Sequence, residues 1–344
     1  MKRREFITLI GGAAAWPFAA RAQQGRVPVV GVLRPVPKDT DQFPEPFRRY
    51  MRAIGWEDGR NVHFLFVWAE GQNERAPALA GELVGQNVDL IVAFGDPATR
   101  AAQRATAAIP IVAMTDDMVG SGLAATLARP GGNTTGVSIL ASELDVKRLE
   151  VLHEFVPQAR RIAVLADTTT ISTRTQLASA ARDLGVELLV FEIQNPAEIG
   201  GALDAMAGAR VDAVNVLASP LLNATRQVII ERTRSAGLPA IYQFPETAEE
   251  GGLLSYGPRI LLCYRHVVSL VDKVLRGTKP AELPIEQPWS CARRALLNCR
   301  SRGGLVMKYA MTSTIPRLPK TIGRRDLLSK NAITTAARMR TTPR

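Results

Sequence analysis

Residues 88–140, VDLIVAFGDPATRAAQRATAAIPIVAMTDDMVGSGLAATLARPGGNTTGVSIL, contain the pattern that decides the fold. An apolar run, Val88–Phe94, is followed by the Ala- and Arg-rich segment Ala98–Ala108 and by a second apolar run, Ile109–Met114. Strand, helix and strand in this order predict a parallel βαβ unit with a right-handed crossover. Both strands are apolar on both faces, as buried parallel strands are. Because open α/β sheets bind ligands at the carboxyl ends of their strands, the functional site is expected there.

Polar residues directly follow several of the predicted strands. Pro97 at a helix start is expected to leave the backbone amides of Ala98 and Thr99 free for a carboxylate, unless Asp96 simply caps its own helix. Asp116 and Asp117 form an acidic pair at a strand end, and no partner at metal-ligand spacing accompanies them, so binding of a cationic group is the simpler prediction. The complete set of expected ligand contacts is Arg34, Gly95, Asp96, Ala98, Thr99, Asp116, Asp117, Asp167, Ser219 and Tyr242.

Strands and helices alternate at βαβ spacing through both halves of the chain. After a 22-residue leader, 322 residues remain, which suggests two domains at about 150 residues each. The predicted class is therefore α/β with two doubly wound, Rossmann-like lobes. The aromatic residues Tyr242, Phe244 and Tyr256 come late in the second half, where they either face a ligand or belong to the core.

The first 22 residues resemble an export signal. Met1–Ile7 is a charged start, Ile7–Phe18 is mostly apolar, and Ala20-Arg21-Ala22 fits an A-x-A cleavage site. Arg3-Arg4 resembles a twin-arginine signal, and an ordinary secretory signal is the alternative. The apolar segment is too short to span a bilayer, which disfavours a retained anchor. The protein is therefore expected to be periplasmic.

The net charge of +11 is concentrated at the two ends of the chain. Residues 289–344 hold thirteen Lys and Arg against one acid, whereas residues 23–288 hold 26 bases and 30 acids. The folded body is thus mildly acidic, and nucleic acid is not an expected partner. The basic tail lacks apolar periodicity and is predicted to be largely disordered, a basic arm for nucleic acid or anionic lipid being the alternative.

The motifs of common enzyme classes are absent from the sequence. There is no H-E-x-x-H, G-x-S-x-G or G-x-x-x-x-G-K. Gly120-Ser121-Gly122 with Ala125 fits G-x-G-x-x-A, but five residues separate it from the strand end, so a loop glycine pair is the better interpretation. The histidines lie far apart, and the three cysteines have no metal spacing. No catalytic residue, metal, cofactor or structural disulfide is predicted.

Several longer motifs together resemble one family, over residues 1 to about 288. They are the leader ending in Ala-Arg-Ala-Gln-Gln, Trp68–Gly71, Ala128–Ser138, Lys147–Leu152, Gly251–Gly257 and Arg276–Pro284. The family is that of ABC-transporter substrate-binding proteins of periplasmic-binding-protein type I fold, which includes tryptophan- and tyrosine-binding members. The resemblance implies two hinged lobes, a ligand in the cleft between them and delivery to a membrane permease.

The resemblance also implies the domain organisation. The export signal is expected at 1–22, the first lobe at 27–136 plus 251–288, the second lobe at 137–250, and a basic tail outside the family pattern at 289–344, for which a shifted reading frame is suspected. Loss of the family's last strand would leave an unpaired edge in the first lobe.

Two departures from the family pattern bear on the ligand. The common Gly-Thr-Pro or Gly-Ser-Pro is Gly95-Asp96-Pro97 here, and an Asn-Pro is Asp167-Thr168. Both place acids at the cleft, which argues against an aromatic amino acid and favours an amine-bearing or polar solute. The expected function is that of an exported solute-binding component of an ABC importer for an amino acid or related polar solute, with permease subunits as partners and membrane contact only through them. An exported α/β enzyme that uses Asp116, Asp117 or Asp167 is the alternative.

Overall fold

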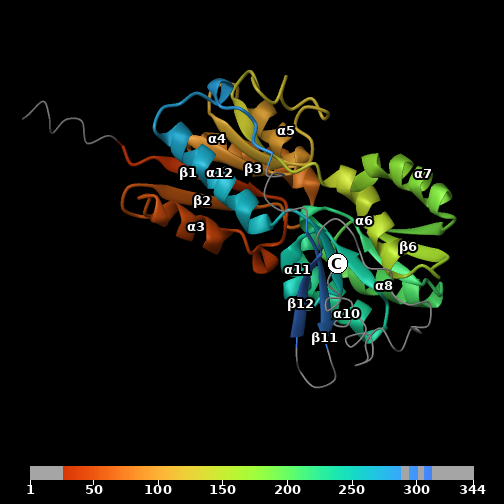
Figure 1. Ribbon diagram of the computed structural model, residues 1–344. Helices are drawn as coiled ribbons and strands as arrows, with labels where there is room; N and C mark the ends of the chain where they lie inside the picture. Colours follow the sequence, from red (N-terminus) through yellow and green to blue (C-terminus); the bar gives the residue numbers. More distant parts are fainter. Residues whose placement is uncertain (1–25, 288–293, 301–305, 312–344) are drawn as a thin grey trace, which may run out of the picture.

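The computed structural model describes residues 26–287, 294–300 and 306–311, and it contains two α/β lobes that lie side by side (Figure 1). The export signal predicted at 1–22 and the last part of the tail, 312–344, lie outside the described residues. Within the described part, no helix is both long and apolar enough to cross a membrane.

The first lobe contains a five-stranded parallel sheet in the order β2-β1-β3-β4-β5. Its strands are β1 (Val29–Arg34), β2 (His63–Trp68), β3 (Leu90–Phe94), β4 (Ile111–Thr115) and β5 (Thr134–Ser138). The helices are α3 (Pro44–Ala53), α4 (Ala76–Gly85), α5 (Asp96–Ala105) and α12 (Ile260–Leu275), with short 3-10 helices η1 (Lys38–Thr40), η2 (Asn73–Arg75) and η5 (Pro280–Glu282).

The unbroken apolar sequence of β3 follows from burial on both faces of this sheet. Leu90, Val92 and Phe94 pack against α3 and α12, whereas Ile91 and Ala93 pack against α4 and α5. Successive side chains of a strand point to opposite faces, so a strand covered on both sides must be apolar at every position. Because β1, β3 and β4 pair in parallel, their carboxyl ends lie together at one edge of the lobe.

The second lobe contains a seven-stranded sheet in the order β12-β11-β10-β9-β8-β6-β7. Its parallel strands are β6 (Arg161–Asp167), β7 (Glu187–Ile193), β8 (Ala213–Val216), β9 (Ala240–Tyr242) and β10 (Leu254–Gly257). The helices are α6 (Ala141–Phe155), α7 (Arg174–Leu184), α8 (Ile199–Gly208), α9 (Pro220–Ala224), α10 (Arg226–Ser235) and α11 (Pro245–Glu249), with η3 (Thr168–Thr173) and η4 (Pro196–Glu198). The predicted two-lobed α/β fold is confirmed.

The lobe boundaries differ from those predicted. β5, which ends at Ser138, belongs wholly to the first sheet, and Leu140 begins the second lobe with a left-handed backbone (φ +41°). β10 pairs with β9 in the second sheet, although the sequence predicts that residues from 251 on belong to the first lobe. The return crossover therefore lies between β10 and α12. A strand's neighbour depends on long-range pairing, which its own sequence does not encode.

The C-terminal segment also differs from the prediction of disorder. Residues Arg294–Arg300 and Val306–Met311 form β11 and β12, an antiparallel hairpin that extends the second sheet from β10. β11 of the hairpin lies beside α11 (Figure 1). The sequence of the hairpin lacks the period-two alternation of a half-buried strand, so the extended pairing is not visible in the pattern of residues.

One edge of the first sheet, β5, is not left unpaired as the sequence predicts, whereas β2 at the other edge pairs only with β1 among the described residues. The edge strand β5 is covered by the chain that follows α12. The Ser138 amide donates to the Glu286 carbonyl oxygen at 2.9 Å, and the Glu286 amide donates to the Gly136 carbonyl oxygen at 2.9 Å. The Thr135 hydroxyl also donates to the Leu283 carbonyl oxygen at 2.8 Å. A segment too short to register as a strand therefore protects the edge.

Ending the chain at Gln287 is expected to lower its stability. The truncation removes the strand that pairs with Leu254–Gly257 and exposes the backbone groups of β10. Each hydrogen bond makes a net contribution of about 0.5–1.5 kcal/mol to the free energy of unfolding. Loss of the bonds between β10 and β11 is therefore expected to lower the free energy of unfolding by at least about 1–2 kcal/mol. Thermal unfolding and limited proteolysis of the full and truncated chains measure this, and equal melting temperatures would contradict the hairpin's structural role.

Candidate functional site

A cavity of about 640 Å³ lies between the two lobes, within the size range of small-molecule sites. The first lobe contributes the carboxyl ends of β1, β3 and β4 and the start of α5. The second lobe contributes the loops after β6 and β8, and α11 and α12 close one side. The site thus forms at strand ends that face each other across the lobes, as the sequence predicted for this sheet type.

Six of the ten predicted contact residues line this cavity, and four do not. Those that line it are Arg34, Gly95, Asp96, Asp116, Asp117 and Ser219. The four residues outside the lining are Ala98, Thr99, Asp167 and Tyr242. Ligand contact by the six residues stays a prediction, although their convergence on one cavity is now established.

The start of α5 differs in two respects from what the sequence predicted. The helix begins at Asp96 and not at Ala98, so Asp96 cannot cap it from outside, and no side-chain cap is formed. Gly95 occupies the cap position with φ +79°, a left-handed conformation that favours glycine. The Thr99 amide and hydroxyl both donate to the Gly95 carbonyl oxygen, at 3.1 and 2.9 Å. The expectation of a free Thr99 amide is therefore wrong, because the helix itself uses it.

The other two excluded residues stabilise the second lobe. The Tyr242 side chain is 1% exposed and its hydroxyl group lies 2.9 Å from the Thr233 hydroxyl. Burial raises the pKa of Tyr242, so it remains neutral. Asp167 is also buried and accepts from the Thr169 amide and hydroxyl, at 2.9 and 2.6 Å. These groups shape the strand ends without reaching the cavity.

Three aspartates gather on the first-lobe side of the cavity. Burial raises the pKa of Asp96, the charges of Asp116 and Asp117 raise it further, and Ser121 and Arg100 oppose the shift. The Asp117 carboxylate accepts from the amides of Val119 and Gly120, at 3.1 and 2.9 Å.

Gly120 makes room for this arrangement. A side chain there would place its first carbon 2.1 Å from a carboxylate oxygen of Asp117. The Gly120-Ser121-Gly122 sequence therefore shapes an aspartate-binding turn in this loop, in agreement with its interpretation as a loop glycine pair.

Arg34 belongs to a buried network that the sequence did not reveal. Its guanidinium donates to both oxygens of Asp41, at 2.9 and 2.8 Å, and lies 4.0 Å from the centre of the Phe94 ring. Trp68 Nε1 donates to Asp41 at 3.0 Å. Burial alone would raise the pKa of Asp41, but Arg34 and these hydrogen bonds hold it below its usual value. Asp41 lies in a loop between predicted elements, where no pattern marks it.

A second arginine connects the lobes. Arg226 of α10 donates to both oxygens of Glu250, at 2.6 and 2.7 Å, and to the Asn223 carbonyl oxygen at 2.9 Å. It also donates to the side-chain oxygen of Gln42 in the first lobe. The sequence pattern marks none of these four residues as a contact between the lobes. We call Gln42, Arg226 and Glu250 the interlobe clasp.

A fully buried ion pair supports the cavity floor on the second-lobe side. Arg148 and Asp145, three residues apart on α6, have side-chain exposures of 0% and 1% and are hydrogen-bonded. Arg148 also donates to the Tyr256 carbonyl oxygen at 3.0 Å, and Asp145 accepts from the Ala218 amide at 3.3 Å. Burial raises the pKa of Asp145 to about 6 although Arg148 opposes the shift.

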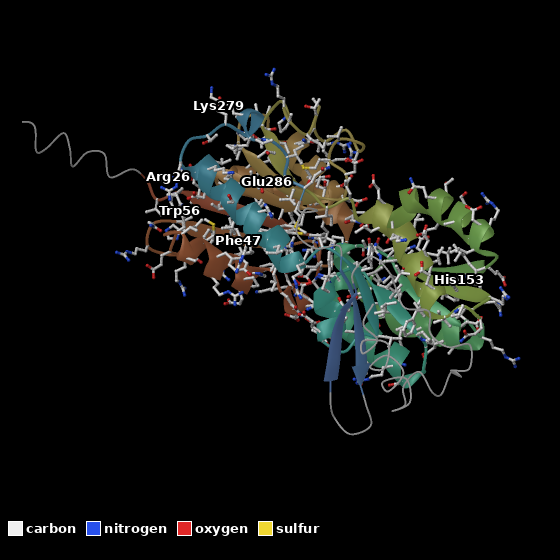
Figure 2. All side chains as sticks on the ribbon, viewed as in Figure 1. Arg26, Phe47, Trp56, His153, Lys279 and Glu286 are labelled. Atoms are coloured by element: carbon white, nitrogen blue, oxygen red, sulfur yellow. The ribbon has the colours of Figure 1, made fainter. Side chains whose placement is uncertain are left out.

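Histidines and metal-ligand clusters do not contribute to the cavity in the described part of the chain. His63 is exposed on β2, His153 lies on α6, and His266 lies on α12, where it contacts Glu286. Figure 2 shows His153 on the second lobe and Glu286 on the first. Among the residues described, no group of three or more His, Cys, Asp or Glu side chains has metal-site geometry. The charged side chains that line the cavity are carboxylates and two arginines, together with aromatic, aliphatic, hydroxyl and amide side chains.

Comparison with known proteins agrees with this two-lobed architecture. Residues 30–300 match the family described as ABC transporter substrate binding protein. The chain belongs to this family. A curated relative, the tyrosine-binding protein of Clostridioides difficile strain R20291, is 26% identical over 250 residues, which are 71% of each chain. The members of this family bind small ligands for transport.

Two solved structures share the fold of this substrate-binding protein. One is an ABC domain in complex with L-Trp from Streptococcus pneumonia, with a TM-score of 0.67 and 22% identity over 79% of this chain and 92% of that one. The other is a conserved domain protein from Vibrio cholerae, with a TM-score of 0.70 and 23% identity over 82% and 96% of the two chains. At these identities the likeness establishes the fold alone.

The contacts between the two lobes show that this substrate-binding protein has its lobes in contact with each other around the cavity. Besides the clasp, the first carbon of a side chain at Gly95 would contact Pro220 at 3.7 Å, and one at Gly71 would contact Pro196 at 3.3 Å. These second-lobe prolines pack against first-lobe glycines. Lobe opening would separate them and break the clasp, which are changes expected of a hinge protein.

Proposed function

We propose that this protein is the exported solute-binding component of an ABC importer, which captures a small polar solute between its lobes and delivers it to a membrane permease. The observation that carries the proposal is the 640 Å³ cavity, whose walls come from both lobes. A ligand in such a cavity stabilises the closed form by its higher affinity for that form. The permease then distinguishes the loaded, closed protein from the open one.

The solute contacts are proposed to be Arg34, Gly95, Asp96, Asp116, Asp117 and Ser219, which converge on the cavity from both lobes. Ser219 has a second role, since its hydroxyl oxygen accepts from the Leu222 amide at 3.0 Å and begins α9. Polar groups held by such local bonds are preorganised, which lowers the entropic cost of binding.

Export is supported by the first 22 residues. The charged start, the apolar stretch and Ala20-Arg21-Ala22 suit a cleaved leader, and Arg3-Arg4 favours the twin-arginine route. Cell fractionation of the wild type and of an Arg3→Lys/Arg4→Lys variant tests both parts. The wild-type protein is expected in the periplasmic fraction, and the variant is expected to stay in the cytoplasm. Wild-type protein in the cytoplasmic fraction would contradict the assignment of an export signal.

A screen of solutes tests the binding function directly. Thermal-shift measurements with amino acids, amines, sugars and small carboxylates should identify solutes that raise the melting temperature, because a ligand of the folded state stabilises it. Isothermal titration then gives Kd. An exported enzyme that uses the cleft aspartates is the alternative function, and chemical turnover of a stabilising solute would favour it over the transport role.

The interlobe clasp gives a mutational test of closure. Gln42→Ala removes the first-lobe partner of Arg226 and leaves the Arg226–Glu250 pair intact. A hydrogen bond to a charged group contributes about 1.5–3 kcal/mol, so the Kd of the solute found in the screen should rise about tenfold or more. Gln86→Ala, on the exposed end of α4, is the matched control. Unchanged Kd in Gln42→Ala would show that the clasp does not stabilise the closed form.

A further inference from the structure

We infer that the solute is an organic cation that carries one or more amino groups and no carboxylate. Its ammonium group is held by the carboxylates of Asp96 and Asp117 and by the hydroxyl group of Thr115, at the strand ends of the first lobe. This inference rests on the proposed function and names the chemical class of its substrate.

The charge of the cavity wall is strongly acidic. Seven acids line it, against two arginines; the acids are Asp41, Asp96, Asp116, Asp117, Asp145, Glu246 and Glu250. Both arginines already form bidentate ion pairs with carboxylates, Arg34 with Asp41 and Arg226 with Glu250. Neither guanidinium is therefore available as the main partner of a solute carboxylate.

The remaining acids differ in how far their charge is neutralised. Asp145 is paired with Arg148, and Glu246 accepts from the Ile260 amide at 3.3 Å and lies 3.9 Å from Arg259. Asp96 and Asp117, by contrast, make no ion pair within 4 Å among the described residues. Asp116 adds a third charge, because it acts electrostatically on both Asp96 and Asp145. A cation is the solute that these carboxylates attract.

The start of α5 disfavours a carboxylate at the same place. A helix N-terminus ordinarily attracts anions through its free amides. Here Asp96 supplies the negative charge in the first turn, and the Thr99 amide donates to Gly95. A zwitterionic amino acid would bring its carboxylate against Asp96, Asp116 or Asp117, so the corresponding amine without that carboxylate should bind more tightly.

Thr115 supplies an observation independent of the acids. Its side chain is 2% exposed, it lines the cavity at the end of β4, and its hydroxyl oxygen has no hydrogen-bond partner among the described residues. Buried hydroxyl groups are nearly always paired, so an unpaired one that borders a cavity indicates a missing ligand group. An ammonium N–H that reaches the neighbouring carboxylates can also donate to this oxygen.

The rest of the wall suits the hydrocarbon part of an amine. Phe94, Phe244 and Tyr264 line the cavity together with Met114 and Leu261. Ligand sites typically combine such an apolar lining with a few polar groups that set orientation. An alkyl or aryl amine places its ammonium group at the aspartates and its chain or ring against these side chains.

The titration of Asp96 supports this chemistry. Burial and the charges of Asp116 and Asp117 raise its pKa, while Ser121 and Arg100, the groups that face it from the neighbouring loop and from its own helix, lower it. A protonated Asp96 does not attract a cation. Amine affinity should therefore rise with pH through the elevated pKa of Asp96 and level off above it.

Isothermal titration with matched solutes tests the inference. The pairs are tyramine and tyrosine, tryptamine and tryptophan, cadaverine and lysine, and agmatine and arginine, with sugars and small carboxylates as further classes. At least one amine is expected to bind at least tenfold more tightly than its amino acid. Asp96→Asn and Asp117→Asn should each raise that amine's Kd about tenfold or more, and Asp183→Asn, on the exposed surface of α7, should leave it unchanged.

The outcomes separate this inference from the function on which it rests. Tighter binding of an amino acid, sugar or carboxylate than of every amine would overturn the inference and leave the solute-binding role intact. Amine binding that is insensitive to both Asp96→Asn and Asp117→Asn, in variants with wild-type melting temperatures, would also overturn it. Absence of binding by every class of solute would instead contradict the proposed function.

Discussion

Replacing Arg148 with methionine is expected to lower the free energy of unfolding by about 3–5 kcal/mol at pH 8. The side chains of Arg148 and Asp145 are 0% and 1% exposed, and Arg148 also donates to the Tyr256 carbonyl oxygen. Removing the arginine leaves a buried carboxylate without its counter-charge and a carbonyl oxygen without its donor. Urea unfolding followed by circular dichroism measures the loss.

The pH dependence of this variant has a defined sign. Burial raises the folded-state pKa of Asp145 from its ordinary value of 3.8 to about 6, so the folded protein holds this proton more tightly than the unfolded chain does. Its contribution to stability is present at low pH and is lost as pH rises through about 6. Without Arg148 the carboxyl group is harder still to ionise, and the destabilisation should be smaller at pH 5 than at pH 8.

The double variant Asp145→Asn/Arg148→Met is the control for this prediction. It removes both charges and keeps an oxygen that can accept from the Ala218 amide. Apolar or neutral replacement of a whole buried pair is far less costly than removal of one partner, so much of the lost stability should return. Equal losses at pH 5 and pH 8, with no recovery in the double variant, would show that no buried charge had been left unpaired.

Gly136→Ala is expected to destabilise the first lobe by about 3 kcal/mol or more. A first side-chain carbon at Gly136 would lie 2.0 Å from the Ala113 carbonyl oxygen and within 3 Å of two further backbone atoms of Ala113. Backbone in the middle of a sheet cannot rotate away as a flexible side chain can. β4 and β5, which pair at these two residues, would have to separate. The melting temperature and the yield of folded protein measure the effect.

Gly81→Ala provides the matched substitution in open space. Gly81 is exposed on α4, and a side-chain carbon there would meet nothing within 4 Å. Alanine in a helix is more stable than glycine by about 0.5–1 kcal/mol, so this variant should gain stability. A similar loss in both variants would contradict the close approach of β4 and β5 as the cause.

The local pattern of residues was sufficient to predict the strands of both sheets up to β10, most of the helices and the two-lobed class, but not the hairpin β11–β12. The apolar runs form β3 (Leu90–Phe94) and β4 (Ile111–Thr115), whose residues are all buried, as continuous hydrophobicity requires. The position of the site at strand ends also followed from the pattern, because parallel strands end at a common edge. Six of ten predicted contacts accordingly line the cavity.

Only the tertiary structure decided which groups meet in the cavity and which sheet each late strand joins. Asp41, Gln42 and Glu250 line the cavity although nothing in their surroundings marks them, and Tyr242 is enclosed in the second-lobe core. β10 and the hairpin β11–β12 join the second sheet through pairing partners that lie elsewhere in the chain. Periodicity records whether a side chain is buried. It does not record what buries it, because that depends on contacts between segments far apart in sequence.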